Sequence, residues 1–100
     1  MTKVIINGDH IKIEGHAMFD YHGKDIVCAA ISSIVITSIN GILSIDENAL
    51  EYSYNSGILE IEVKKHDKIT KTLIKNMIDL LKELENQYEK NIKVEEVHYD

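Results

Sequence analysis

The sequence contains two pairs of short segments in which apolar and polar residues alternate, and each pair is joined by a glycine-containing turn signal. Alternation of this kind is typical of strands with one buried face. The first pair, Lys3–Asn7 and Ile11–Glu14, is joined at Asn7-Gly8, a dipeptide that favours a tight β-hairpin. The second pair alternates through residues 50–54 and 59–63 and turns at Asn55-Ser56-Gly57. The chain is therefore constrained to a fold that contains two β-hairpins.

The segment between the hairpins predicts a helix over residues 26–40, although its Ile, Val and Thr residues individually favour strands. Strict alternation fails at Ser32-Ser33, whereas its apolar residues follow steps of three and four, as one face of a helix requires. The dipeptide Asn40-Gly41 predicts the helix end, because glycine commonly adopts the left-handed conformation there. The apolar residues that carry this spacing are Val27, Ile31, Ile34, Val35 and Ile42.

A second helix is predicted from about Lys68 to Gln87, followed by a last strand that contains Ile92, Val94 and Val97, with fraying at His98–Asp100. Its predicted apolar face consists of Ile69, Leu73, Met77, Leu80, Leu81, Leu84 and Tyr88. The expected order is ββαββαβ in one domain spanning residues 1–100. Hairpins with helices between them predict the α+β class: a two-layer sandwich with a mostly antiparallel sheet and two helices on one face.

Composition narrows the classes of function. No apolar run approaches the roughly 18 residues of a membrane span, since Ser, Thr and Asn interrupt the longest one, so we expect no membrane partner. The N-terminus lacks a signal-peptide core, which favours the cytoplasm. The net charge of −6 argues against direct nucleic-acid binding, because phosphates would be repelled. The four histidines at positions 10, 22, 66 and 98 form no i, i+4 pair, and with one cysteine they predict no metal site or cofactor.

The single cysteine, Cys28, is either a small core residue or a working thiol. It lies in the first turn of the predicted helix, where the peptide dipoles favour a thiolate. His16 closes the preceding strand, so its imidazole could take the thiol proton and later return it to a leaving amine. On residues alone, a core cysteine is the commoner explanation, since free cysteine is among the most buried residue types. His22 is nearer to Cys28 in sequence and remains a rival base.

Two motifs extend the signal beyond this pair. Gly15-His16-Ala17, followed by Asp25-Ile26-Val27-Cys28-Ala29 with Ser32 one turn later, resembles the signature of the bacterial ribosomal-processing cysteine protease family, also called Prp. The resemblance covers nearly the whole chain, because its length and element order fit too.

The resemblance implies a cysteine endopeptidase that removes an N-terminal extension from the large-subunit ribosomal protein L-twenty-seven, cutting behind aromatic residues. Cys28 would be the nucleophile, and His16 the general base and acid. It also implies a homodimer, and a loop, Ala17–Lys24, that gates the site. Apart from the resemblance, Gly23 in this loop could serve as a hinge. Asp25 and Ser32 match motif positions of less certain role. For Asp25 we favour a helix cap, since a carboxylate beside the thiol would raise its pKa.

The competing hypothesis is a non-catalytic module, associated with the ribosome, that captures an extended peptide on an exposed edge strand. It shares the fold and the partner, a segment of a basic ribosomal protein, but needs no reactive thiol. Accessibility of Cys28 distinguishes the two hypotheses.

Overall fold

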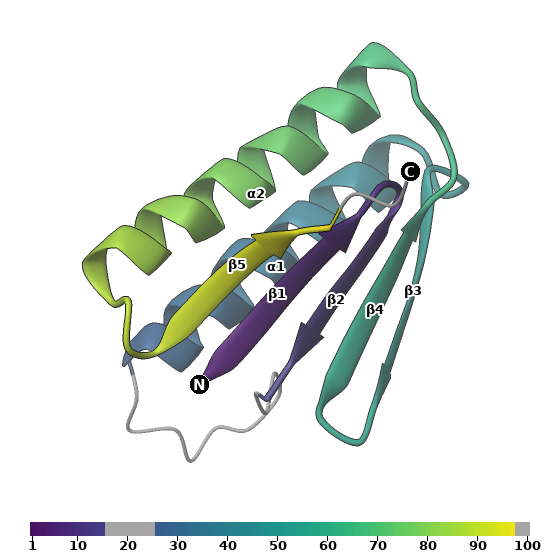
Figure 1. The fold of residues 1–100 in the computed structure, drawn as a ribbon. Coiled ribbons are helices and arrows are strands. Elements are labelled where there is room, and N and C mark those ends of the chain that lie inside the picture. Colours follow the sequence, from purple (N-terminus) through teal and green to yellow (C-terminus); the bar gives the residue numbers. More distant parts are fainter. Residues whose placement is uncertain (16–25, 98–100) are drawn as a thin grey trace.

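The computed structural model describes residues 1–15 and 26–97, and within them the elements follow the predicted order ββαββαβ (Figure 1). Both helices were predicted as helices and all five strands as strands. Their bounds are β1 (Thr2–Asn7), β2 (His10–Glu14), α1 (Ile26–Ile45), β3 (Leu50–Asn55), β4 (Ile58–Val63), α2 (Lys68–Gln87) and β5 (Ile92–Glu96).

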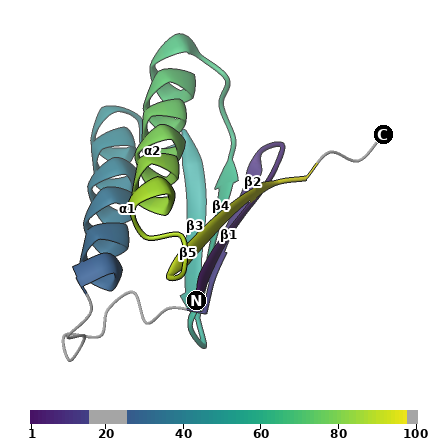
Figure 2. The same ribbon diagram turned by 60° about the vertical axis from the view of Figure 1, so that its left-hand side comes forward.

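The five strands form one sheet in the order β3-β4-β2-β1-β5. Three of its four strand pairs are antiparallel, and β1 with β5 is the parallel pair. Both helices cover the same face, and none of the described residues forms a helix on the other, uncovered face (Figure 2). The predicted two-layer α+β sandwich with a mostly antiparallel sheet is therefore confirmed.

The two hairpins use different tight turns. In the first, Asn7 pairs with His10, so the turn residues are Gly8 and Asp9, one position later than the Asn7-Gly8 signal suggested. Gly8 has a φ of 57°, which suits a turn with glycine at its first central position. In the second, residues 56 and 57 both have positive φ values, 53° and 79°, which is the requirement of a type I′ turn.

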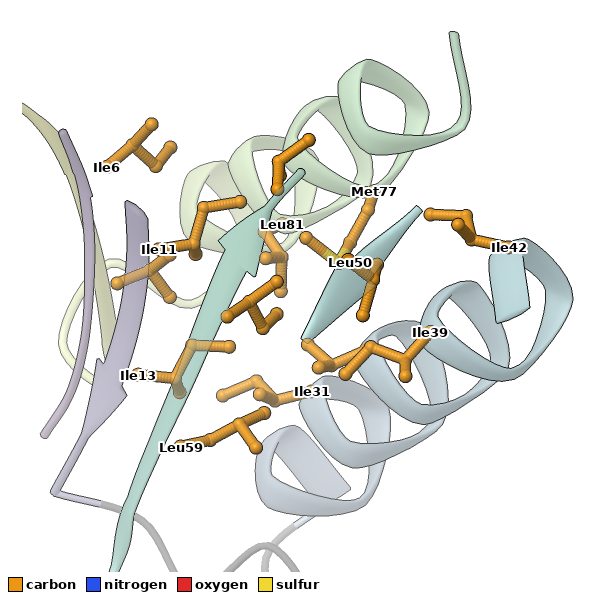
Figure 3. Packing of buried hydrophobic residues seen from close by; sticks show 14 of the residues in the cluster. Ile6, Ile11, Ile13, Ile31, Ile39, Ile42, Leu50, Leu59, Met77 and Leu81 are labelled. Atoms are coloured by element: carbon orange, nitrogen blue, oxygen red, sulfur yellow. The ribbon is translucent and has the colours of Figure 1, made fainter. Parts of the chain in front are cut away.

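The core lies between the sheet and the two helices (Figure 3). Ile11 and Ile13 from β2 and Leu59 from β4 point toward the helices, and Ile31 of α1 and Leu81 of α2 pack onto them. All five side chains are at most 2% exposed. The strand residues between them face the uncovered side of the sheet, as the alternation predicted.

Helix α1 continues through the predicted stop at Asn40-Gly41 and ends at Ile45, so that boundary was wrong. Ile39 and Ile42, on either side of the signal, are both buried against the core, and their packing outweighs the local preference of glycine. Gly41 itself lies on the exposed side of α1, where a Cβ atom would meet nothing within 4 Å.

Helix α2 has the predicted bounds, but its buried face is rotated from the predicted stripe. Thr70, Met77 and Leu81 are its buried residues, whereas Ile69 is 52% exposed. The helix begins after Asp67, whose carboxylate accepts the backbone N–H and the hydroxyl of Thr70. These hydrogen bonds hold the pKa of Asp67 below its ordinary value. Thr70 is thereby satisfied inside the core.

By length and composition α1 is apolar enough to cross a membrane, contrary to the expectation that its Ser and Thr residues exclude this. Hydroxyl side chains lower the average hydropathy of such a segment only slightly, which explains the difference. In the structure, however, Val27, Ile31 and Val35 pack against the sheet as part of the core. Core helices pass the same test of length and composition, so the finding is weak evidence for a membrane span.

Candidate active site

Cys28 is the third residue of α1 and lies in its first turn. The preceding residue, Val27, is 3% exposed and points into the core, whereas the Cys28 side chain is partly exposed and belongs to no disulfide. Since successive residues of a helix are rotated by about 100°, Cys28 falls on the flank of α1 beside the buried face. Cys28 is therefore not sealed in the apolar interior. A catalytic role requires this accessibility.

The amino end of a helix carries a partial positive charge, and Cys28 lies in the first turn of α1. Among the residues that the structure describes, that first turn contains no acidic side chain. Backbone N–H groups in a helix's first turn have no acceptor within the helix and point along its axis toward this end. A thiolate and the oxyanion of an acyl-transfer intermediate are both stabilised by such an environment.

Gly15 fixes the end of β2, directly before His16. It has a φ of 79°, in the left-handed region that favours glycine. A Cβ atom at this position would lie 2.5 Å from the backbone oxygen of Met1. Conformation and space therefore both require glycine here. In the sequence, the Gly15-His16 motif was interpreted through its histidine. The structure shows that the glycine has a separate role, which is to place the end of β2.

The carboxyl end of β2 and the amino end of α1 lie at the same end of the sandwich. Figure 3 shows Ile31 of α1 beside Leu59 of β4. Leu59 pairs with Ile13 of β2, which lies two residues before Gly15. Cys28 precedes Ile31 by three residues, less than one turn. The strand that precedes His16 and the helix that carries Cys28 thus converge at this end.

The remaining predicted site residues divide into two groups. Ser32 lies one turn beyond Cys28 on the same flank of α1 and is partly exposed. His16, His22, Gly23, Asp25 and the loop Ala17–Lys24 lie outside the described residues, so their predicted roles stay predictions.

Two other histidines engage carboxylates away from this end. His10 Nδ1 lies 2.9 Å from Glu62 Oε2 on the uncovered face of the sheet. His66 Nε2 lies 2.8 Å from both carboxylate oxygens of Asp9. Within residues 1–15 and 26–97, no three His, Cys, Asp or Glu side chains are grouped so as to hold a metal ion. Of the predicted catalytic pair, Cys28 is the member that lies within the described residues.

A two-layer α+β sandwich with an accessible thiol at a helix amino end has the features of a cysteine hydrolase. A family model for the cysteine protease Prp matches residues 1–93. The chain therefore belongs to the Prp family of cysteine proteases.

Curated relatives and solved structures agree with this membership. The ribosomal processing cysteine protease Prp of Mycoplasma genitalium is 31% identical over 102 residues, covering all of both chains. The Prp of Bacillus subtilis is 28% identical over 90 residues, covering 83% of this chain and 80% of its own. The crystal structure of S. aureus Prp with a covalently linked product peptide superimposes with a TM-score of 0.86 at 24% identity, covering 97% of this chain and 100% of that one. The fold is thus that of solved Prp structures.

Proposed function

We propose that this protein is a cytoplasmic cysteine endopeptidase that removes the N-terminal extension of the large-subunit ribosomal protein L-twenty-seven during ribosome maturation, cutting behind aromatic residues. The observation that carries the proposal is the position of Cys28, partly exposed in the first turn of α1 in a member of the Prp family. Its M. genitalium, S. aureus and B. subtilis relatives are called ribosomal processing proteases, which supports the substrate class.

In the proposed mechanism, His16 takes the proton of the Cys28 thiol, and the thiolate attacks the scissile carbonyl carbon. The tetrahedral oxyanion is stabilised by backbone N–H groups at the start of α1. Imidazolium then gives its proton to the leaving amine as the C–N bond breaks, which leaves a thioester on Cys28. A water molecule, deprotonated by His16, attacks the thioester and releases the acid and the thiol. The covalently linked product peptide in the S. aureus relative supports a covalent intermediate.

The other residues of the motif have supporting roles in this proposal. Asp25 caps α1, which keeps the amino end of the helix ordered around the thiol. Ser32, one turn after Cys28, contacts substrate or positions the nucleophile. The loop Ala17–Lys24, with Gly23 as its hinge, closes over the bound peptide and excludes water.

Partner and assembly follow the same proposal. The chain carries a net charge of −6, which favours encounter with a substrate whose mature end is basic. It acts as a homodimer, without direct nucleic-acid contact and without a membrane partner.

The deciding experiment incubates the purified protein with a synthetic peptide that spans the extension and the first mature residues of the ribosomal protein. Wild type should cleave, Cys28→Ala should not, and Ser33→Ala, which changes an exposed residue of the same helix, should retain full activity. His16→Ala should lose several orders of magnitude in kcat, and His22→Ala should lose little. If wild type and Cys28→Ala cleave equally, the nucleophile is misassigned; if neither cleaves but both bind the peptide, the protein is the non-catalytic binding module.

A further inference from the structure

The two edges of the sheet, β5 and β3, are built differently. Asn91 and Val97 each make a backbone hydrogen bond to β1, of 2.9 and 2.8 Å. Since backbone groups alternate in direction along a strand, the N–H groups of Ile92 and Val94 point away from β1, toward the outer edge. The outer edge of β5 is therefore defined by these even-numbered residues.

The outer edge of β5 is closed by α2 and its C-cap. The Val94 N–H donates to the Glu85 carboxylate at 2.6 Å, and the Ile92 N–H donates to the Tyr88 carbonyl oxygen at 3.3 Å. An added strand would have to displace both acceptors. Natural sheets commonly cover an edge in this way, because unpaired strand edges attract other chains.

Within residues 1–15 and 26–97, no side chain or helix cap closes the outer edge of β3 in this way. The Val63 N–H donates to the Asp9 carbonyl oxygen in the turn before β2. Because backbone groups alternate in direction along a strand, those of Glu62 point the other way, toward β3, and those of its partner Glu51 point toward β4. By alternation, the backbone groups of residues 50, 52 and 54 point outward. In the part of the chain that the structure describes, neither Leu50 nor Tyr52 makes a hydrogen bond on that outer side.

The β3 edge is also regular. It pairs with β4 in continuous register over six residues, from Leu50 to Asn55, without a bulge or a proline. It therefore lacks two of the devices that ordinarily protect an edge, a bulge and a proline. Since the same molecule closes its β5 edge, the open β3 edge is suited to receive another strand.

We propose that the outer edge of β3 is the substrate-docking edge, where an extended peptide segment adjoining the scissile bond pairs with the backbone of Leu50 and Tyr52 as a sixth strand. The inference rests on the proposed function and adds how the substrate is held. Main-chain hydrogen bonds would supply affinity, and alternate side chains of the peptide would supply specificity.

The position of β3 relative to Cys28 fits this role. Tyr54, near the end of β3, pairs with Leu59, and Leu59 lies beside Ile31 of α1 (Figure 3). Cys28 precedes Ile31 by less than one turn, so one end of β3 and the thiol lie at the same end of the sandwich. A peptide that follows β3 is thereby led toward the nucleophile.

The two sides of β3 also select the peptide's chemistry. On the uncovered face, Glu51, Glu60 and Glu62 help to line a shallow hollow of about 190 Å³. His10 lies against Glu62 and Lys64 against Glu51, so the three carboxylates outnumber the cations beside them. Tyr52 alternates with Glu51 and pairs with the buried Ile61, so its side chain belongs to the helix-bearing side of β3, and the residue is 51% exposed. A docked strand should therefore present basic residues on the acidic side and apolar or aromatic residues on the tyrosine side, alternating along its length. The acidic side disfavours a second copy of this chain, which would bring its own carboxylates.

The test measures binding of the ribosomal-protein peptide to Cys28→Ala, with a single backbone N-methyl group placed at each peptide position in turn. N-methylation removes one donor and adds bulk at that position. Along the docked segment we expect a two-residue period: alternate positions weaken binding about tenfold, and the positions between them change it little. A profile without this period overturns the proposal.

A matched pair of protein variants tests the edge itself. Tyr52→Pro removes the outward N–H, and proline is tolerated on edge strands whose N–H faces solvent. Tyr52→Val keeps the N–H and the strand preference. We expect about a tenfold higher KM for Tyr52→Pro than for Tyr52→Val, with similar kcat and retained circular dichroism. Equal KM values overturn the proposal. So does loss of dimerisation in Tyr52→Pro with unchanged peptide affinity, since the edge would then hold a second copy.

Cleavage of the unmodified peptide by wild type separates the test of β3 docking from the test of the protease function. Cleavage with equal KM values contradicts β3 docking and leaves the protease function intact. Periodic N-methyl effects on binding, without cleavage by wild type, contradict the protease function and leave β3 docking intact.

Discussion

Alanine substitution at two glycines should change stability in opposite directions. At Gly15 the backbone φ is 79°, where an alanine costs about 1–2 kcal/mol. Its Cβ would also lie 2.5 Å from the Met1 oxygen and would have to retreat by roughly 0.9 Å to reach the 3.4 Å of ordinary contact. Overpacking of this kind costs about 1–3 kcal/mol. Gly15→Ala should therefore destabilise the protein by about 2–5 kcal/mol.

At Gly41 the same substitution should stabilise. The residue is inside α1, exposed, and a Cβ atom would meet nothing within 4 Å. Alanine in a helix interior is favoured over glycine by roughly 0.5–1 kcal/mol, partly because it restricts the unfolded chain. Gly41→Ala is therefore the matched control for Gly15→Ala: the same atoms are added, with the opposite expected sign.

Urea denaturation followed by circular dichroism measures both free energies, with thermal melting as a second readout. For a domain of this size, about 1 kcal/mol shifts Tm by roughly 4–8 °C, so Gly15→Ala should lower Tm by more than about 8 °C and Gly41→Ala should raise it by a few degrees. Gly15→Ala should also lower peptidase activity at temperatures where it stays folded, because His16 follows directly. If both substitutions shift stability the same way, the conformational argument at Gly15 is refuted.

Three further results are expected. Iodoacetamide should alkylate Cys28 at about pH 6.5 in the folded protein, and the pH dependence of the alkylation rate should have its midpoint below the free-thiol pKa of about 8.5. Resistance to alkylation at about pH 6.5 would contradict an activated thiolate. Asp67→Ala should lower Tm, whereas Asp67→Asn should keep the helix cap. Because the pKa of Asp67 is lowered in the folded protein, its ionised form stabilises the fold, and wild type should be more stable than Asp67→Asn at neutral pH. This difference in stability should disappear as pH falls below about 4, and a difference that does not depend on pH would contradict the assignment. Glu85→Ala should leave the Val94 N–H unpaired and destabilise the protein by about 1 kcal/mol. It should also promote self-association, measured by sedimentation, because the β5 edge is then open. Unchanged stability and sedimentation would show that Glu85 does not protect this edge.

Local sequence signals were sufficient to predict the hairpins and helices because their causes are local. Alternation along β1 and β2 and the glycine at position 8 specify a hairpin with no information from the rest of the chain. The bounds of α2 were likewise predictable, since periodic apolar residues and Asp67 act within a few residues.

Other features depend on contacts between distant segments. The end of α1 was misplaced because burial of Ile42, beyond the Asn40-Gly41 signal, is a tertiary effect. The parallel pairing of β1 with β5 is not encoded in either strand's own pattern. The role of Glu85 at the β5 edge had no sequence signal either, since a glutamate on a charged helix looks like any solvated residue.

The candidate site was predictable only in the part that depends on local sequence signals. The place of Cys28 in the first turn of a helix follows from the local apolar spacing, and the structure bears it out. That the carboxyl end of β2 meets this helix end depends on the pairing of Ile13 with Leu59, which only the assembled sheet determines. The roles of His16 and Asp25 remain predictions for the cleavage assay.

The parallel contact between β1 and β5 has a consequence for folding. Thr2 pairs with Ile92, so β1 waits for a strand that follows both helices and the second hairpin along the chain before that side of the sheet is complete. Contacts between such remote positions are slow to form, because a large loop must close before any of them is gained. Until β5 has formed, β1 therefore presents this edge without its neighbour, and the sheet is complete only when the two strands meet.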